Sequence, residues 1–355
     1  MNAASAHLAR LGAASRPSGS AGATEARAYC AGVLTDLGFA VAERPFEYSK
    51  FAGAYATPLA GVLVPLFAFG LLVLPNHSRT FVAGLFIAAA LAGVMFHYLG
   101  GPSVLDLGAF RARGVNLEAV RGSSEPAVWL VAHIDSKWQP VSMIVRVLGV
   151  ILSAVGLVAL AVFALTTAPV GVTRVAFVVA CIGAVPLMLS YVGARNHGTL
   201  DNASGVAAVL EAAAVVGRNA NVGILITDAE ELALAGARAW SRSRAARIAL
   251  NCDSVDDDGV LTVMYSSPTP RRLLEATERA SHAEGEPLRV IRLIPGILTD
   301  HVALAAAGWT TVTLSRGSIR TLQRIHTSRD TLATMRGTGI AVAARVLATT
   351  AMELS

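Results

Sequence analysis

The chain has 355 residues, of which 54% are hydrophobic and only 15% charged, with a formal net charge of +5. An average soluble domain carries about 25% charged residues, so the mean hydropathy of +0.56 predicts that some of this chain lies in lipid. The Lys and Arg residues are scattered without an aromatic-interleaved basic stripe, which argues against nucleic acid as a partner and favours membrane lipid headgroups. Three scattered cysteines form neither a disulfide framework nor a paired-cysteine zinc motif.

Four apolar stretches each approach the roughly 20 residues that cross a bilayer. They are Pro58–Pro75, Thr80–Tyr98, Met143–Thr166 and Val175–Ala194. A short turn at 76–79 joins the first two, and a turn with Pro169, Gly171 and Arg174 joins the last two. We therefore expect two transmembrane hairpins. The alternative, buried helices of a large soluble core, is disfavoured by their length and near absence of charge.

The rest of the chain alternates short Val/Ile/Leu runs with amphipathic helical patterns, as parallel α/β folds do. The expected strands are Phe39–Tyr48, Gly114–Val120, Ala127–His133, Val222–Thr227, Ile248–Cys252, Leu261–Tyr265, Leu288–Ile294 and Thr310–Leu314. The expected helices are Glu25–Leu37, Ser204–Val216, Ala233–Ser243, Thr269–Ala283, His301–Ala307 and Thr331–Glu353. This pattern predicts an α/β fold with a mostly parallel central sheet flanked by helices.

The apolar hairpins interrupt this pattern, so one α/β catalytic domain is expected in three segments. These segments are predicted at 1–54, 101–140 and 196–355, with the first transmembrane hairpin at 55–100 and the second at 141–195. Without the hairpins about 250 residues remain, which is a normal size for one α/β domain.

Polar residues that suit catalysis follow several of the strands. His133 and Asp135 come at the end of a strand, where open α/β sheets bind ligands. A carboxylate two residues after a histidine can orient the imidazole, although a His-x-Asp pair alone is more typical of a surface loop. Asp201 opens the segment DNASGVAAVLE before a helix that begins near Ser204. It is either a helix cap or a carboxylate that bridges two cations.

Two adjacent carboxylates, Glu230 and Glu231, follow the strand in NVGILITDA. Like charges this close raise each other's pKa and are costly without cations to neutralise them. A solvated acidic loop is the alternative. Because adjacent side chains diverge, one can ligate a metal while the other reaches the metal-bound water as general base.

Two further acidic and two further imidazole side chains complete the candidate set. Asp253 ends a third strand, IALNCD, and His326 lies in RIHTSRDT before the last helix. Asp300 is a natural helix cap, and His301 beside it could face the crevice. No residue is decisive alone, but His, Asp, Glu-Glu, Asp and His occur in this order, each at a strand end or in a loop entering a helix. Imidazoles and carboxylates without a thiolate suit a catalytic zinc pair rather than a closed structural site.

This pattern resembles the co-catalytic di-zinc peptidases of clan MH, which include aminopeptidases, glutamate carboxypeptidase and membrane-bound relatives. The matching segments are HIDSK, DNASGVAAVLE, AEELALAGARAW, TDH and HTSRDT, together with an Arg-Pro-x-Gly-Ser turn near the N-terminus. The resemblance covers nearly the whole chain outside the hairpins and implies a zinc-exopeptidase-like three-layer sandwich. It also implies two zinc ions, with Asp201 bridging both, His133 and Asp253 completing one site, and Glu231 and His326 completing the other.

The resemblance implies roles for three further residues. Glu230 would be the general base, Asp135 would orient the first histidine, and His301 would lie near the substrate carbonyl. The Asp201–Asn202 bond is one that is often cis in this family. The chain departs from the family in two respects: a hairpin separates the first His-x-Asp from the bridging aspartate, and Ile325 stands where a tyrosine often precedes the final histidine.

The resemblance implies a zinc-dependent exopeptidase, most simply an aminopeptidase, that hydrolyses terminal peptide bonds with a metal-bridging water and Glu230 as base. One alternative is a non-enzymatic membrane scaffold or receptor on a peptidase fold. Another is a zinc amidohydrolase or cyclase that acts on a non-peptide amide. The sequence makes no prediction of oligomeric state.

Four crossings would place all three α/β segments on one side of the membrane. More Lys and Arg residues flank the hairpins on that side than in the two far turns, so the positive-inside rule favours a cytoplasmic catalytic domain. The N-terminus also lacks the apolar core of a signal peptide. The second hairpin leaves the fold between the strand of His133 and the helix led by Asp201, so we expect the site to face the bilayer and to cleave peptides held at a membrane best.

Overall fold

In the computed structural model, the structure describes residues 3–73, 83–84, 86–87, 89–90, 93–94, 101–122, 125–166, 168–293 and 297–355. The chain divides into two compact units. The first unit comprises Met1–Tyr48, Arg111–Trp138 and Ala194–Ser355, and the second comprises Ser49–Phe110 and Gln139–Gly193. Each unit is described by itself below.

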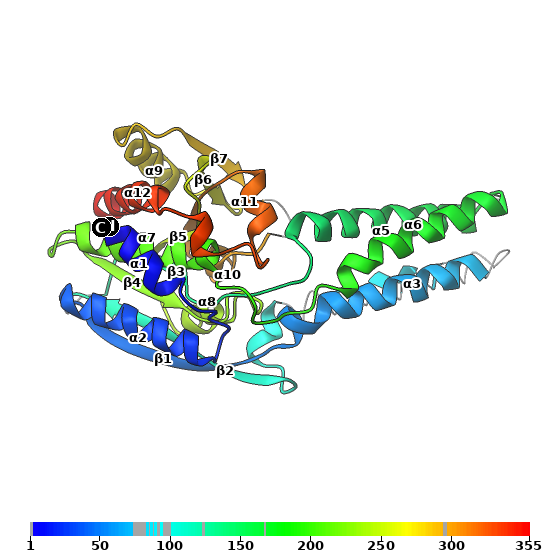
Figure 1. The fold of residues 1–355 in the computed structure, drawn as a ribbon, viewed down its shortest axis with the longest axis horizontal. Coiled ribbons are helices and arrows are strands. Elements are labelled where there is room, and N and C mark those ends of the chain that lie inside the picture. The colour runs from blue at the N-terminus through cyan, green and yellow to red at the C-terminus, as the bar shows by residue number, and fades with distance from the viewer. Residues whose placement is uncertain are drawn as a thin grey trace. The chain divides into compact units, whose positions relative to one another are not determined.

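A mixed sheet forms the centre of the first unit (Figure 1). Its eight strands among the described residues are β1 (Ala40–Ser49), β2 (Arg111–Val120), β3 (Val128–His133), β4 (Val222–Thr227), β5 (Ile248–Val255), β6 (Val260–Tyr265), β7 (Leu288–Arg292) and β8 (Thr310–Gly317). They lie in the order β1-β2-β4-β3-β5-β8-β6-β7. The inner strands β4, β3, β5 and β8 are parallel, whereas β2 is antiparallel to β4 and β6 is antiparallel to β8.

The antiparallel strands have a simple cause in the lengths of the connections. A crossover between parallel strands needs a dozen or more residues. The links at 121–127 and 256–259 are shorter than that, so β2 and β3 run in opposite directions, as do β5 and β6. The prediction of a mostly parallel sheet therefore holds for the four inner strands. The sheet as a whole is mixed.

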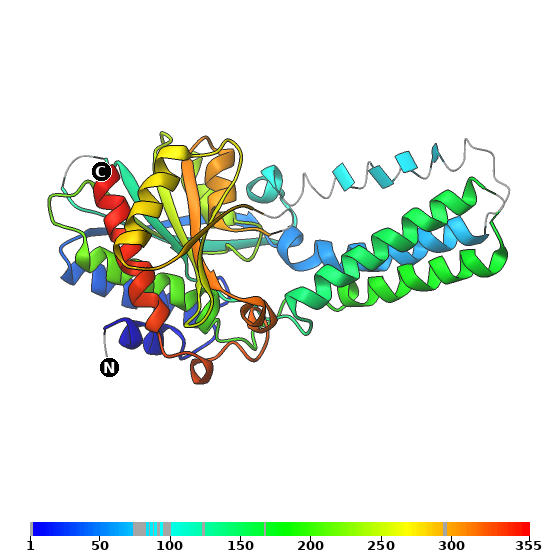
Figure 2. The same ribbon diagram turned by 90° about the horizontal axis from the view of Figure 1, so that it is seen from above.

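Side chains alternate between two apolar layers along β3. Leu130 and Ala132 belong to a large core beneath α1 (Ala3–Leu11), α2 (Ala21–Asp36), α7 (Ser204–Val215), α9 (Arg271–Ala283) and α12 (Thr338–Leu354). Trp129 and Val131 point to the other face and pack with Trp240 of α8 (Ala235–Ser241) and residues of α10 (Asp300–Ala306). Helices thus cover both faces of the sheet (Figure 2).

All eight predicted strands are present, with boundaries that differ by a few residues, and Ile294 of the seventh prediction lies outside the described residues. The last predicted helix is shorter than expected. A short 3-10 turn, Leu332–Thr334, precedes it, and α12 begins only after Gly337, which adopts a left-handed φ of 81°. Helices α1 and α11 (Ile319–Arg324) were not predicted.

The second unit contains the short turns η1 (Phe51–Ala56) and η2 (Pro102–Leu105) and the helices α3 (Thr57–Val73), α5 (Met143–Ala164) and α6 (Val170–Met188). Small residues let α5 and α6 approach closely. A Cβ on Gly156 would lie 2.5 Å from the Ala180 nitrogen, and one on Gly183 would lie 2.4 Å from the Ser153 nitrogen. Such small-residue contacts are typical of membrane helix pairs.

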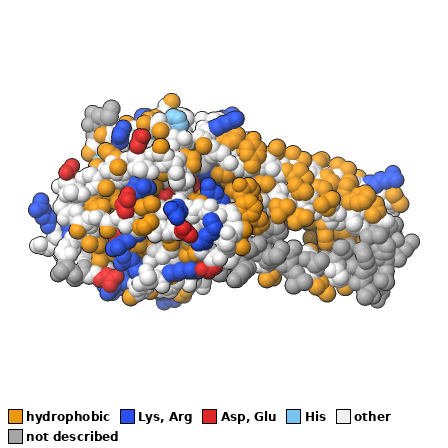
Figure 3. Space-filling view, turned by 90° about the horizontal axis from the view of Figure 1, so that it is seen from below, with side chains coloured by type: hydrophobic (Ala, Val, Ile, Leu, Met, Phe, Trp, Pro, Cys, Tyr) orange, Lys and Arg blue, Asp and Glu red, His pale blue; other side chains and the backbone are white. Residues whose placement is uncertain are grey.

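Three helical segments of the described residues are long and apolar enough to span a membrane: Phe51–Val73, Met143–Ala164 and Val170–Met188. The predicted stretch Thr80–Tyr98 lies mostly outside the described residues. The last span begins at Val170 rather than Val175, because Pro169 starts the helix and Gly171 and Arg174 belong to it instead of to a turn. Figure 3 shows hydrophobic side chains over the outside of these helices.

Candidate metal centre

The predicted ligands meet where three neighbouring parallel strands end. His133 is the last residue of β3, Asp253 lies near the end of β5, and the loop that carries Glu231 follows β4. Their neighbour Asp201 lies in the turn η3 (Thr199–Ala203), directly before α7, and its bond to Asn202 is cis. The carboxyl ends of parallel strands share one edge of a sheet, which is where open α/β folds gather functional groups.

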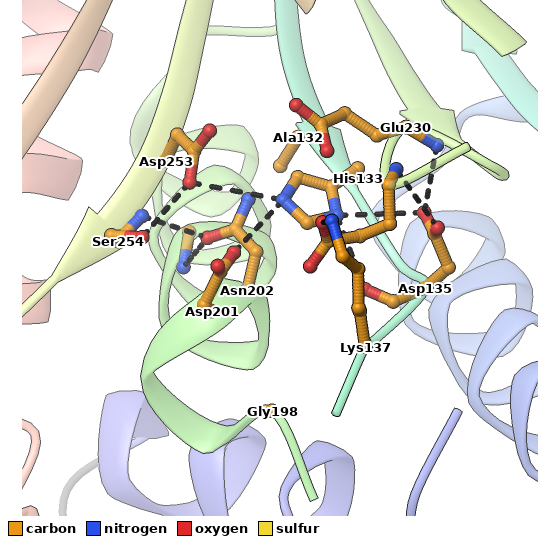
Figure 4. A network of polar contacts seen from close by, with 12 residues as sticks. Ala132, His133, Asp135, Lys137, Gly198, Asp201, Asn202, Glu230, Asp253 and Ser254 are labelled. Carbon is orange, nitrogen blue, oxygen red and sulfur yellow. Dashed lines mark hydrogen bonds and ion pairs between the residues drawn. The ribbon is translucent and has the colours of Figure 1, made fainter. Parts of the chain in front are cut away.

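The first group consists of His133, Asp201 and Asp253 (Figure 4). The Nε2 atom of His133 lies 3.2 Å from Asp201 Oδ1 and 3.7 Å from Asp253 Oδ1. All three residues are buried. Their candidate ligand atoms lie within 4.8 Å of one another, which is close enough to share one metal ion.

The second group consists of Asp201, Glu231 and His326, again with ligand atoms within 4.8 Å of one another. His326 Nε2 lies 3.0 Å from Asp201 Oδ2 and 2.9 Å from Glu231 Oε1. Asp201 is therefore common to both groups and turns one carboxylate oxygen toward each. The structure brings together all five residues for which the sequence predicted a ligand role.

Asp135 holds two elements of this cluster at once. Its Oδ1 lies 3.5 Å from His133 Nδ1, on the side of the imidazole away from Asp201. The same carboxylate accepts the backbone N–H of Glu230 at 3.1 Å and that of Glu231 at 3.2 Å. The carboxylate thus fixes the turn that bears the two glutamates, while the backbone carbonyl of Asp135 lies 3.1 Å from His133 Nδ1 and orients the imidazole.

Burial of so many carboxyl groups leaves the cluster rich in negative charge. Burial and the neighbouring carboxylates raise the pKa of Asp253 and raise that of Glu230 well above its ordinary value. Burial alone would lower the pKa of His133, but Glu230 and the aspartates beside it raise it well above its ordinary value. Uncompensated buried charge is costly, so these groups favour a bound cation.

Two buried ligand atoms of the cluster are available to bind such a cation. His133 Nε2 and Glu231 Oε1 are fully buried, and among the described residues their short contacts are with other candidate ligands, Asp201 and His326, without the geometry of a hydrogen bond. His133 belongs to the first group of candidate ligands and Glu231 to the second. Imidazole nitrogen and carboxylate oxygen are the donor set of catalytic zinc sites, so the residues present suit zinc.

Lys137 is a member of the site that the sequence did not reveal. Its Nζ lies 3.2 Å from Glu231 Oε2, which leaves Oε1 of that carboxylate facing His326. Burial would raise the pKa of Glu231, but His326 and Lys137 hold it at about 2. The only sequence signal was the position of Lys137 in HIDSK, four residues after His133.

Glu230, the predicted base, is buried at the edge of the cluster. Its backbone is held by Asp135, and in Figure 4 its side chain reaches toward His133. Among the charges that act on His133, that of Glu230 has the largest effect. This position suits a group that exchanges protons beside the metal ligands.

Asp300 and His301 lie in surroundings that differ from those expected. Thr299, not Asp300, occupies the N-cap of α10, and the buried Asp300 carboxylate accepts a hydrogen bond from Thr227. Burial raises the pKa of Asp300 to about 7. His301 is fully buried, with ring nitrogens 2.7 Å from the hydroxyls of Thr299 and Thr313 and 3.0 Å from that of Ser266. Its assignment to substrate binding stays a prediction.

Fold and cluster together define a class: an α/β sheet with helices on both faces and a buried histidine-carboxylate cluster at the carboxyl ends of its strands, as suits a metal-dependent hydrolase. The model of peptidase family M28 matches residues 116–351, and the chain belongs to this family. The resemblance to the clan MH peptidases is therefore confirmed. A search of curated proteins found no match.

Solved structures with the same fold include aminopeptidases and a cyclase. An aminopeptidase from Aneurinibacillus sp. strain AM-1 is 13% identical, with a TM-score of 0.60, and the match covers 99% of this chain and 93% of that one. A zinc aminopeptidase from Bacillus subtilis is 13% identical, with a TM-score of 0.58 over 99% and 94%. A glutaminyl cyclase from Bacteroides thetaiotaomicron is 14% identical, with a TM-score of 0.59 over 99% and 97%. The sheet and helices are thus similar to those of zinc aminopeptidases.

Proposed function

We propose that this chain is a membrane-anchored, two-zinc exopeptidase, most simply an aminopeptidase. The observation that carries the proposal is the position of Asp201, whose Oδ1 lies 3.2 Å from His133 Nε2 and whose Oδ2 lies 3.0 Å from His326 Nε2. A carboxylate between two such groups is suited to bridge a pair of cations. Membership of a peptidase family and the fold of zinc aminopeptidases support a zinc hydrolase.

In this proposal His133, Asp201 and Asp253 hold one zinc ion, and Asp201, Glu231 and His326 hold the other. The chemistry that such a pair supplies when bound is polarisation of the scissile carbonyl and acidification of the attacking water. Each residue role below follows from a contact of the chain itself.

Glu230 accepts the proton of the attacking water on its carboxylate and returns it to the leaving amine. Its buried position raises the pKa of this carboxyl well above the ordinary value, which suits a group that must both take and release a proton. The backbone carbonyl of Asp135 lies 3.1 Å from Nδ1 of His133 and accepts its N–H, so that Nε2 would direct its lone pair toward a zinc ion held with Asp201 and Asp253. Lys137 restrains Glu231 through one oxygen only.

The test is chelation followed by reconstitution with zinc, assayed on peptides with free and with blocked N-termini. We expect about two zinc ions per chain, loss of activity on chelation, recovery on adding zinc, and release of free amino acids from the unblocked peptides alone. Zinc well below one equivalent, with no hydrolysis, would instead support a non-enzymatic membrane scaffold or receptor on the same fold.

A cyclase or other amidohydrolase is the second candidate, because glutaminyl cyclases are among the structures with this fold. The two activities separate on one substrate, a peptide with an N-terminal glutamine. An aminopeptidase releases free glutamine, whereas a glutaminyl cyclase releases ammonia and leaves the peptide bond intact.

The proposal of a membrane anchor is supported by the surface of the second unit. Val158, Val175 and Leu66 are each more than 60% exposed, at 62%, 63% and 63%. Apolar surface of this extent is unusual in water and ordinary in lipid. We place catalytic domain segments at 1–54, 101–140 and 196–355, and transmembrane hairpins at 55–100 and 141–195, with four spans in total.

The catalytic segments lie on the cytoplasmic side in this proposal, as the distribution of Lys and Arg predicts. Single cysteines placed at Ser78, in the first predicted far turn, and at Thr166, between α5 and α6, would test it with a membrane-impermeant thiol reagent. We expect labelling from outside intact cells. Labelling of these positions only after the membrane is opened would reverse the orientation.

A further inference from the structure

Arg16 lies between α1 and α2, distant in sequence from every candidate ligand, and is 1% exposed. Its guanidinium donates to five backbone carbonyl oxygens, those of Leu11, Ala14, Ile134, His197 and Gly198. Nε and Nη2 donate to one carbonyl each, and the two N–H groups of Nη1 face the other three, so every nitrogen of this guanidinium donates to main-chain oxygen. Burial lowers the pKa of Arg16 to about 10, which leaves it charged at neutral pH.

Two sets of these carbonyls flank the metal centre. Ile134, bonded to Nε at 2.8 Å, directly follows the ligand His133. His197 and Gly198, bonded to Nη1 at 2.6 Å and to Nη2 at 2.8 Å, lie just before Asp201. One side chain therefore joins two ligand-bearing segments that are separated in sequence by residues 139–193 of the second unit.

Main-chain contacts reinforce this junction. The backbone N–H of Arg16 donates to Ser136 Oγ at 2.8 Å, and the N–H of Ser136 donates to the Arg16 carbonyl at 3.0 Å. Gly198 adopts a φ of 58°, and a Cβ there would lie 2.4 Å from Ser136 Cβ. The segment before Asp201 is thus pressed directly against the segment after His133.

Asp330 holds the same loop from the C-terminal side. Its Oδ1 accepts the N–H of Leu200 at 2.5 Å, and its Oδ2 accepts that of Asp201 at 3.1 Å. A buried cation therefore holds carbonyls at the start of the loop, and a buried anion holds amides at its end. Metal–ligand distances tolerate only about 0.2 Å of error, which explains why the turn η3, whose backbone is non-helical at Asp201 and Asn202, would need such support.

We propose that Arg16 is a positioning residue for the metal centre, which fixes the backbone at His133 relative to the backbone at Asp201. This role rests on the proposed function, because it takes the two residues to be metal ligands. Arg16 touches neither ligand side chain in this role and acts through the main chain on both sides of them.

The test measures zinc affinity by chelator competition on the full-length protein in detergent, for wild type, Arg16→Met and Arg121→Met. Arg121 is a matched control, since its guanidinium donates to the carbonyls of Leu37, Ala213 and Val216 at 2.8, 3.3 and 3.0 Å. It follows β2, which runs antiparallel to β4, and so lies at the opposite edge of the sheet from the cluster.

We expect Arg16→Met to weaken zinc affinity by about 10-fold or more and to lower kcat more than it changes KM. We expect Arg121→Met to lower the unfolding temperature while its zinc affinity stays within about 2-fold of wild type. Wild-type zinc affinity in Arg16→Met would overturn the proposal. So would an equal loss in both variants, because that loss would reflect general destabilisation.

If Arg16→Met does not fold, the variant Arg16→Lys tests the positioning role instead. A lysine amine keeps the charge but presents its donors from one point, so it cannot bridge carbonyls on both sides, and zinc affinity should fall. Unchanged zinc affinity in Arg16→Lys would then overturn the role. A wild-type protein that binds no zinc would overturn the proposed function itself, and with it this role.

Discussion

At the scale of single residues, Asp135 organises more of the centre than its place two residues after His133 suggested. The sequence predicted an orienting partner for one imidazole. The carboxylate also accepts the backbone N–H groups of Glu230 and Glu231, which belong to a segment about 95 residues away. No periodicity or spacing in the sequence marks such a contact, because it depends on how β3 and β4 align in the sheet.

The Asp135→Asn variant should therefore lose metal affinity. The two carboxylate oxygens accept one backbone N–H each, and an amide has only one acceptor oxygen, so its NH2 group would face one of these N–H donors. We expect zinc affinity to fall by about 10- to 100-fold, as measured by chelator competition. Asp257→Asn is the control, since Asp257 also accepts backbone N–H groups, those of Arg336 and Thr338, but at the start of α12. Equal affinities in the two variants would contradict the role of Asp135.

The Glu230→Gln variant should keep both metals and lose turnover. Glutamine has nearly the shape of glutamate but cannot accept the proton, so kcat should fall by about 100- to 10,000-fold. Zinc content measured by elemental analysis should stay at the wild-type value. In Glu231→Gln, by contrast, we expect reduced zinc content. Full turnover in Glu230→Gln would show that Glu230 is not the general base.

At the scale of elements, the sequence predicted every strand of the sheet, because each is a short apolar run bounded by polar residues. The absence of a side chain at Gly205 lets α7 approach its neighbours closely: a Cβ there would lie 2.2 Å from Asn202 Oδ1 and 2.4 Å from the Cys252 carbonyl oxygen. The sequence did not predict α1 or α11, since nine and six residues are too few to show a clear helical period.

The five candidate ligands lie together in the structure. Three of them, His133, Asp201 and Asp253, belong to strand ends or a helix start at one edge of the sheet, and Glu231 lies in the loop after β4. The contacts that Lys137 and Arg16 make around the metal centre could not be predicted. Their contacts join segments whose spacing depends on the packed fold, and neither residue type is a metal ligand.

Gly205→Ala should destabilise the first unit, because the added methyl group meets a fixed side chain and a strand carbonyl. Overpacking of this kind costs about 1 to 3 kcal/mol, to be measured by chemical denaturation. Gly32→Ala in α2 is the control: its Cβ would meet nothing within 4 Å, so the variant should be neutral or more stable by about 0.5 to 1 kcal/mol. Equal effects at both positions would argue against a tight approach at Gly205.

At the scale of the whole molecule, the stability of the metal-free protein should depend on pH. Burial raises the pKa of Asp300 from 3.8 to about 7 and also raises those of Asp253 and Glu230. Between about pH 4 and about pH 7 these carboxyl groups stay protonated in the folded state and lose their protons in the unfolded state. Folding stability therefore falls as pH rises across this range. The raised pKa values of His133 and His326 continue this loss above about pH 6.5, whereas the lowered pKa of the buried His301, about 4, opposes it between about pH 4 and 6.5.

Thermal unfolding of the chelated protein at pH 5 and pH 7 checks this expectation. The metal-free protein should unfold at a lower temperature at pH 7, and zinc should reduce the difference because it neutralises the same carboxylates. A midpoint that rises with pH in the chelated protein would show that other groups control its stability.

The division of the ligands along the chain also sets the order in which the centre can be completed during synthesis. His133 is made first, residues 139–193 of the second unit follow, and only then do Asp201, Glu231 and Asp253 appear. The group of His133, Asp201 and Asp253 is complete once residue 253 has emerged, whereas the other group waits for His326. A chain that ends between these two points has the residues for one ion and lacks those for the second.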